Sequence, residues 1–276
     1  MKTYKKFFGI IVCLLFGSAL QTFAQDTPWI IEVTTLHWNM EKEDFSMPEW
    51  KAIESEYHQK VTMKNELVKG AETLLHTYSP DNSELIFIRA YENWGDVYKS
   101  ADRDWELTKE AWPDSADRVQ RGMNAASYYS NLHSDEIYST LSHAKFKTDW
   151  NDSTSVVFYM KKTHSVPPSA VKDGSGKERN AVFKEYIENV YHKDDDIQAY
   201  YPMRHLYGAD GREVVEFFVY ESLEKMVGDV SSNNSDLVKA HWPDEDKRKA
   251  FFKKFIKYNS PWHGDWVYTN VPELHK

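Results

Sequence analysis

The sequence predicts an α+β fold in which one β-α-β-β-α-β unit occurs twice in tandem. The first observation is an internal repeat: residues 76–94 return as residues 205–223, with 6 of 19 positions identical. The second is the tripeptide Trp-Pro-Asp, which stands at 112–114 and again at 242–244. Unrelated segments of ordinary composition agree at roughly one position in sixteen, so a duplication explains both matches better than chance does.

The first unit is expected to occupy residues 28–145. Its strands are indicated by β-branched residues, its helices by apolar side chains at helical spacing, and its hairpin by turn-forming residues. Asp114 is expected to cap the N-terminus of a helix. The expected order is strand 29–36, helix 47–68, strands 72–78 and 84–91, helices 94–112 and 114–131, and strand 136–141.

The second unit is expected to occupy residues 155–276 and to repeat this order. Residues 146–154 are polar and are expected to link the two units. The expected elements are strand 155–162, helix 177–192, strands 198–207 and 213–220, a helical stretch before Trp242, a helix ending near Tyr258, and strand 266–271.

Residues 1–24 have the pattern of a secretory signal peptide. Three lysines precede an apolar run over residues 7–16, and Ala24 supplies the small residue of a cleavage site. The run is shorter than the roughly 20 residues that span a bilayer. We therefore expect a periplasmic or secreted protein; a membrane anchor that stays attached is the alternative interpretation.

The bulk composition excludes several classes of function. The one cysteine, Cys13, lies in the predicted signal peptide, so the rest of the chain has no disulfide, thiolate nucleophile or cysteine-ligated metal. The formal net charge is −9, and it becomes −12 when the first 24 residues, with their three lysines, are removed. Such a surface repels phosphate backbones and anionic lipids, so we expect neither a nucleic-acid partner nor a membrane partner after cleavage.

A β-α-β-β-α-β unit is the ferredoxin-like fold, whose helices cover one face of an antiparallel sheet. The bare faces of two such units can bury each other, which gives a barrel with helices outside. In this pattern and in its repeat, the chain resembles the dimeric α/β-barrel superfamily, here fused into one chain. The resemblance covers nearly the whole sequence after residue 24. Branches of that superfamily include monooxygenase-like, isomerase-like and haem-binding proteins, and the resemblance does not choose among them.

The alternation of side chains along the third strand of each unit predicts two faces. The apolar row is expected to lie under the helices: Ile86, Ile88 and Ala90, matched by Val215, Phe217 and Val219. The opposite row is expected to face the barrel interior: Phe87, Arg89 and Tyr91, matched by Glu216, Phe218 and Tyr220. The repeats differ here, because Arg89 aligns with Phe218 and Glu216 aligns with Phe87.

Two charges of opposite sign inside a barrel require an explanation, because an unpaired buried charge is costly. One interpretation is a structural ion pair between Arg89 and Glu216. Another is that water enters the end of the barrel and hydrates the two charges, which then have no function. The functional hypothesis is that Arg89 holds an anionic or enolic ligand and Glu216 transfers a proton, with the aromatic residues Phe87, Phe218, Tyr91 and Tyr220 around the ligand.

His76 and His205 occupy equivalent positions, each two residues before a tyrosine, Tyr78 or Tyr207. If this row points inward, the four side chains approach a common cavity. A neutral imidazole is then a candidate general base and a tyrosine a candidate donor to an oxyanion. The alternative is that residues kept in both copies serve the shared fold.

Three functions remain open at this point. The first is an exported protein that binds a small apolar or aromatic ligand in the barrel, with a homodimer also compatible. The second is a cofactor-free monooxygenase or isomerase with a barrel histidine as base. The third is a non-catalytic envelope interaction protein. No metal or other cofactor is expected, because the sequence has no His-Glu-x-x-His motif; a haem would need an axial histidine facing a large apolar pocket.

Overall fold

The computed structural model describes residues 28–146, 154–232 and 234–276. The predicted signal peptide, 1–24, and nearly all of the predicted linker, 146–154, lie outside the described residues. Within the described part of the chain, no helix is long and apolar enough to cross a membrane.

The order of elements confirms two β-α-β-β-α-β units. The first contains β1 (Ile30–Trp38), α1 (Met47–Lys60), β2 (Gly70–Tyr78), β3 (Glu84–Tyr91), α2 (Trp94–Ala111), α3 (Ser115–Ala126) and β4 (Tyr129–Thr140), followed by the short β5 (Lys145–Phe146). The second contains β6 (Val157–Ser165), α4 (Gly176–Asn189), β7 (Ile197–Tyr207), β8 (Glu213–Tyr220), α5 (Leu223–Ser232), α6 (Ser235–His241), α7 (Glu245–Ile256) and β9 (Asn259–Asn270).

Equivalent residues begin and brace equivalent helices in the two units. Asp114 and Asp244 are the N-caps of α3 and α7, where their side chains accept hydrogen bonds from backbone N–H groups. Arg118 donates to the backbone oxygen of Trp112 at 2.6 Å, and Arg248 donates to that of Trp242 at 2.9 Å. These repeated residues therefore fix the shared fold.

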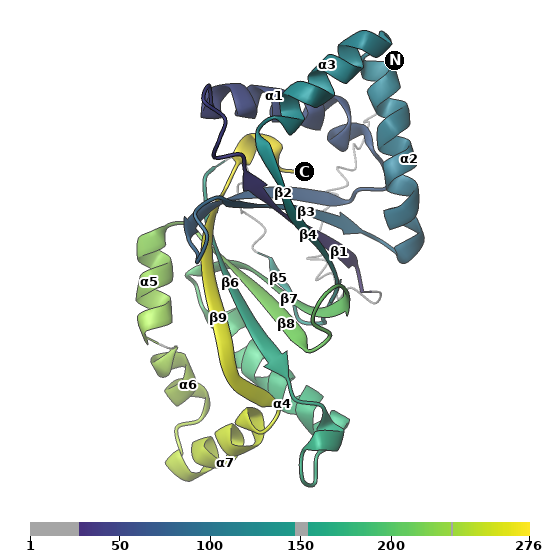
Figure 1. Cartoon of the computed structure of the whole chain (residues 1–276). Helices are drawn as coiled ribbons and strands as arrows, with labels where there is room; N and C mark the ends of the chain where they lie inside the picture. Colours follow the sequence, from purple (N-terminus) through teal and green to yellow (C-terminus); the bar gives the residue numbers. More distant parts are fainter. Residues whose placement is uncertain (1–27, 147–153, 233) are drawn as a thin grey trace, which may run out of the picture.

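The strands close into one antiparallel barrel. Their order is β4-β1-β3-β2-β9-β6-β8-β7, and β4 pairs in turn with β7 to complete a ring of eight, while β5 adds to β7 outside the ring. The two repeats therefore join edge to edge at two seams, β2 with β9 and β4 with β7. Figure 1 shows the helices of the first repeat at one side of this barrel and those of the second at the other.

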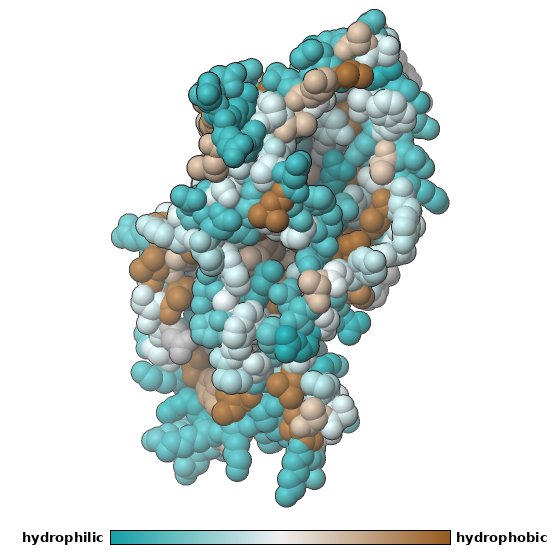
Figure 2. All heavy atoms as spheres, viewed as in Figure 1, coloured by the Kyte–Doolittle hydropathy of each residue, from teal (hydrophilic) through white to brown (hydrophobic). Residues whose placement is uncertain are grey.

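The visible face of the molecule is mostly polar (Figure 2). On the face shown in Figure 2, hydrophilic residues dominate and apolar side chains appear in small separate groups. The large apolar clusters are buried in the barrel and beneath the helices.

The expected assignment of the two strand faces is wrong. Ile86, Val215, Phe217 and Val219 belong to the largest buried cluster, which draws on strands of both repeats and fills the barrel; Ile88 and Ala90 pack against it. An eight-stranded barrel is just wide enough for side chains to fill, so its interior takes the most apolar row. The row with Arg89 and Glu216 lies instead beneath the helices, where each charge finds a partner.

Candidate functional site

A cavity of about 150 Å³ remains at one part of the barrel interior. It is bounded by strands of both repeats and by the β7–β8 turn. Apolar side chains form one wall: Val33, Ile86, Met160, Val215 and Phe217. Polar and aromatic residues, with Ala209 of the turn, form the other: Thr35, Glu84, Ser134, Glu136, Tyr138, Lys162, Asp210, Glu213 and Trp266.

The cavity is bounded by equivalent positions of the two repeats. Thr35 pairs with Ile86, and Lys162 pairs with Val215. Since Ile86 and Val215 match in the repeat, Thr35 and Lys162 are equivalent. The same reasoning gives the pairs Val33 and Met160, Glu84 and Glu213, and Glu136 and Trp266. The cavity is therefore shared by the two repeats.

Two matching hydrogen bonds cross between the repeats beside the cavity. The Tyr138 hydroxyl donates to Glu213 Oε2 at 2.9 Å, and the Tyr268 hydroxyl donates to Glu84 Oε2 at 3.2 Å. Burial, and then the neighbouring carboxylate, raise the pKa of both tyrosines, so both phenols stay protonated as donors. These bonds connect the repeats and fix the two glutamates in the wall.

One side of the cavity carries a lysine. The Lys162 Nζ lies 3.7 Å from Glu213 Oε1 and 5.6 Å from the centre of the Trp266 ring. A carboxylate and an aromatic face together form a typical environment for an ammonium group.

The other side carries Glu136. Its two carboxylate oxygens accept from the backbone N–H of Ala209 at 3.0 and 3.1 Å, which holds the β7–β8 turn against β4. His205 Nε2 lies 3.2 Å from Glu136 Oε2, but the geometry leaves this buried nitrogen without a hydrogen bond. The backbone of Gly208 has a φ of 137° and approaches the Glu136 carboxylate closely.

The structure does not bring Arg89 and Glu216 together, so the predicted barrel ion pair is wrong. Arg89 Nη1 donates to Asp104 Oδ2 of α2 at 2.6 Å. Glu216 accepts from the Tyr200 hydroxyl at 2.5 Å beneath the second-repeat helices. Each buried charge is satisfied within its own repeat, so neither lines the cavity.

The four aromatic residues predicted around the ligand also face the helices. Phe87 packs in the cluster under α1, and Phe218 in the cluster that includes Met226 of α5. The Tyr91 hydroxyl donates to Glu32 at 2.9 Å, and that of Tyr220 donates to Asp229 of α5 at 2.5 Å. They are part of the helix-facing core.

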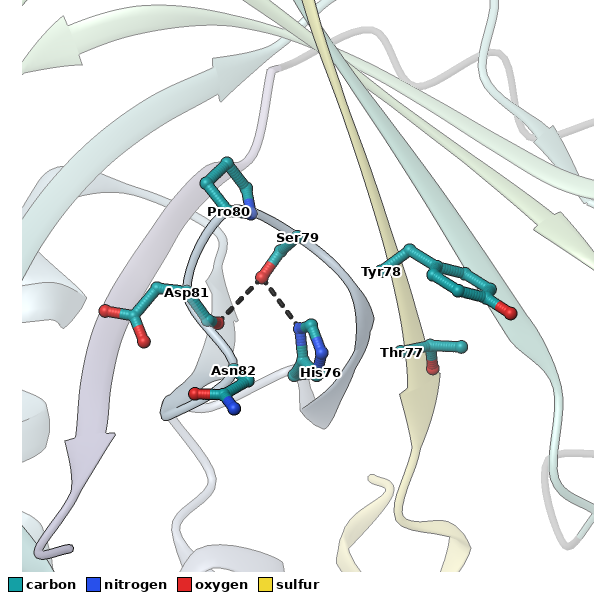
Figure 3. A pocket seen from close by; sticks show the side chains of 7 residues that line it. All are labelled: His76, Thr77, Tyr78, Ser79, Pro80, Asp81 and Asn82. Carbon is teal, nitrogen blue, oxygen red and sulfur yellow. Dashed lines mark hydrogen bonds between the residues drawn. The ribbon is translucent and has the colours of Figure 1, made fainter.

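The second-strand histidines and tyrosines do not form a common cavity. His205 is buried beside Tyr138, with ring centres 6.0 Å apart. His76 contacts the Ser79 hydroxyl at 2.8 Å inside the β2–β3 turn, and Figure 3 shows the Tyr78 ring directed away from that turn. Tyr78 and Tyr207 are 63% and 68% exposed. Only His205 of these four lies near the cavity.

The sequence interpretation missed most of the cavity wall. The sequence predicts strands that contain Lys162 and Trp266, but it does not predict which way these side chains face. The available signal was that Phe158 and Met160 alternate with Lys162 in β6. A charged residue in the apolar row of a barrel strand marks a polar part of the interior.

Comparison with known proteins defines the class of fold. No family model and no curated protein matches the sequence. A candidate monooxygenase from Fusobacterium nucleatum superposes with a TM-score of 0.56 at 12% identity, over 89% of this chain and 94% of that one. A candidate monooxygenase from Lactobacillus acidophilus gives 0.53 at 10% identity, over 88% and 93%. A chlorite dismutase variant from Candidatus Nitrospira defluvii gives 0.51 at 9% identity, over 90% and 93%.

At these identities the matches establish the fold alone. The chain has the duplicated dimeric α/β-barrel fold, with two ferredoxin-like repeats in one polypeptide. It is similar in fold to proteins described as monooxygenases and chlorite dismutases. Its cavity chemistry has to be derived from its own residues.

Neither the barrel cavity nor the space beneath the second-repeat helices accommodates haem, which some proteins with this fold bind. The barrel cavity is about 150 Å³, small even among ligand pockets and too small for a ring system of the size of haem. Beneath the second-repeat helices, Tyr191, Tyr200 and Phe218 fill the space with ring centres 4.9–5.1 Å apart. Among the described residues, no group of three or more His, Cys, Asp or Glu side chains is placed to hold a metal ion.

Proposed function

We propose that this protein binds a small molecule in the barrel cavity between its two repeats. The observation that carries the proposal is the concentration of charge there: Glu84, Glu136, Lys162 and Glu213 line a cavity next to the main apolar cluster of the barrel. Burying charged groups costs free energy, so a barrel that served structure alone would be more stable with apolar residues at these positions.

The volume of the cavity limits the ligand. About 150 Å³ corresponds to roughly five water molecules at about 30 Å³ each. This space accommodates a small molecule or one end of a longer one, with its apolar part against Val33, Ile86 and Phe217. A polycyclic or lactone substrate of a monooxygenase or isomerase is larger, and the cavity therefore supports binding better than that reaction.

The N-terminal pattern supports the same function outside the cytoplasm. Three lysines and a short apolar run precede Ala24, as in exported proteins. A chain without cysteine after that point does not depend on the redox state of its compartment. We propose that the mature protein meets its ligand in the periplasm or in the medium.

A substitution that closes the opening of the cavity tests the proposal. Ser134 is exposed beside Thr35 on the inward face of β4, so Ser134→Trp places an indole over the opening. Asn131 is exposed on the same strand and does not line the cavity, so Asn131→Trp is the matched control. Native mass spectrometry of protein from its own host should find a bound molecule in the wild type and the control, and little or none in Ser134→Trp.

Thermal shift assays provide a second measurement. A panel of small amines, acids and neutral solutes should contain compounds that raise the melting temperature of the wild type and of Asn131→Trp more than that of Ser134→Trp. A wild-type protein that carries no molecule and responds to none of the panel would contradict the proposed function.

A further inference from the structure

We infer that the ligand is an organic primary ammonium ion whose charged group binds between Glu84 and Glu136. This inference rests on the proposed function and adds the chemical class of the ligand. It comes from a comparison of the two repeats within the same cavity, because the second repeat already contains an ammonium group at the corresponding place.

In the second repeat, that ammonium is Lys162. Its Nζ lies 3.7 Å from Glu213 and 5.6 Å from the Trp266 ring centre, and the Tyr138 hydroxyl holds Glu213 in place. The lysine side chain is 23% exposed, so its charge is partly removed from water and depends on these neighbours.

In the first repeat, the same place has no cation. Thr35 replaces the lysine, Glu84 corresponds to Glu213, and Glu136 replaces the tryptophan. The Tyr268 hydroxyl holds Glu84 just as Tyr138 holds Glu213. Among the described residues, no lysine or arginine lies within ion-pair distance of Glu84 or Glu136. The first repeat therefore lines its part of the cavity with two carboxylates, whereas the second lines its part with a carboxylate and an ammonium group.

In the part of the chain that the structure describes, the remaining charges around the cavity supply no lysine or arginine to this pair. Lys162 neutralises Glu213, and Arg212 together with His164 faces Asp210. Among the described residues, His205 is the group near Glu136 that can become positively charged, and its Nε2 is buried without a hydrogen bond. A bound monocation would supply the missing charge, and its N–H groups would use carboxylate lone pairs that the protein leaves open.

The chemistry of the wall favours a primary ammonium. Such a group has three N–H donors, which correspond to the three acceptors Glu84, Glu136 and Thr35. The space beside them is apolar and accepts about five non-hydrogen atoms at the density of water. A short alkylamine, or the amine end of a longer diamine, has this shape.

The test compares three four-carbon compounds of similar size: n-butylammonium, n-butanol and butyrate. Calorimetric titration of the full chain should give measurable binding for n-butylammonium and at least tenfold weaker binding for the other two. Glu84→Gln and Glu136→Gln should each weaken n-butylammonium binding at least tenfold. Asp135→Asn removes a neighbouring carboxylate that bonds Thr34 on the outer face, so it should keep affinity within about twofold.

Thr35→Lys supplies the cation from the protein itself. This variant should bind n-butylammonium at least tenfold more weakly while melting at or above the wild-type temperature, which separates loss of binding from loss of folding. Wild-type binding of butanol or butyrate as strong as that of n-butylammonium would overturn the ammonium class and leave the proposed function standing. Unchanged affinity in both glutamine variants would overturn the placement between Glu84 and Glu136.

Discussion

Glu216 shows how an ionisable side chain can be bound beneath the helices, away from the barrel cavity. It accepts a hydrogen bond from Tyr200 and lies in the aromatic layer under α4. Burial raises the pKa of the Glu216 carboxyl, and Lys161 and Tyr200 offset only part of that effect. When the pKa of a carboxyl group is higher in the folded than in the unfolded state, the folded state loses stability as the pH rises and the group ionises.

The sign of this effect gives a prediction for Glu216→Gln. Below the unfolded-state pKa of about 4.3, both states carry the neutral carboxyl and the variant should melt close to the wild type. As the pH rises toward the higher folded-state pKa, the wild type loses stability, and at pH 7 the variant should be more stable by on the order of 1 kcal/mol. Thermal melts followed by circular dichroism at pH 4 and pH 7 check this.

The exposed Glu221 at the end of β8 supplies the control, because Glu221→Gln should leave the melting temperature unchanged at both pH values. A lower melting temperature of Glu216→Gln at pH 7 would mean that the ionised carboxylate stabilises the fold.

Charged side chains inside the barrel could be predicted from the sequence, but the strand face that carries them could not. Arg89 and Glu216 are predicted to face the barrel interior, and each aligns with an aromatic residue of the other repeat. The cavity-lining pairs that differ in charge are Thr35 with Lys162 and Glu136 with Trp266. The alternation of side chains along a strand defines two faces, and the closed barrel shows which of them is interior.

At the scale of elements, the β7–β8 turn positions the carboxylate of Glu136. Gly208 has a φ of 137°, which side chains other than glycine rarely adopt, and a Cβ there would lie 1.7 Å from Glu136 Oε2. Gly208→Ala should therefore displace the turn or Glu136 and cost about 1–3 kcal/mol in unfolding free energy. Urea denaturation measures the loss.

Gly211 in the same turn is the matched control. It has no positive φ, and an added Cβ would lie 3.8 Å from His205 Nδ1, an ordinary contact. Gly211→Ala should stay within about 0.5 kcal/mol of the wild type. Equal losses in the two alanine variants would show that the turn is not held by its approach to Glu136.

The order of elements could be predicted because each has a local signal, but several boundaries could not. Strands β4 and β9 begin at Tyr129 and Asn259, seven residues before the expected starts at 136 and 266. These segments are rich in Ser, Asn, His and Asp and lack β-propensity. They become strands because β1 and β6 pair with them, an interaction that is distant in sequence.

At the scale of the whole molecule, the barrel interior is one core built by both repeats. Ile31 and Leu74 of the first repeat pack in the same cluster as Phe217 and Tyr268 of the second. The two seams, β2 with β9 and β4 with β7, add backbone hydrogen bonds between the repeats. The repeats should therefore unfold together, although each has its own helices.

Leu74→Ala tests this coupling. Leu74 is fully buried in the shared core, so its truncation should cost about 2–5 kcal/mol and lower the melting temperature by about 5–15 °C. Leu132, 61% exposed, is the control, and Leu132→Ala should change little. Scanning calorimetry should show a single peak that shifts as a whole in Leu74→Ala. If the peak split, with one part at the wild-type temperature, the second repeat would be stable without the first, and the cavity between them would not depend on a common core.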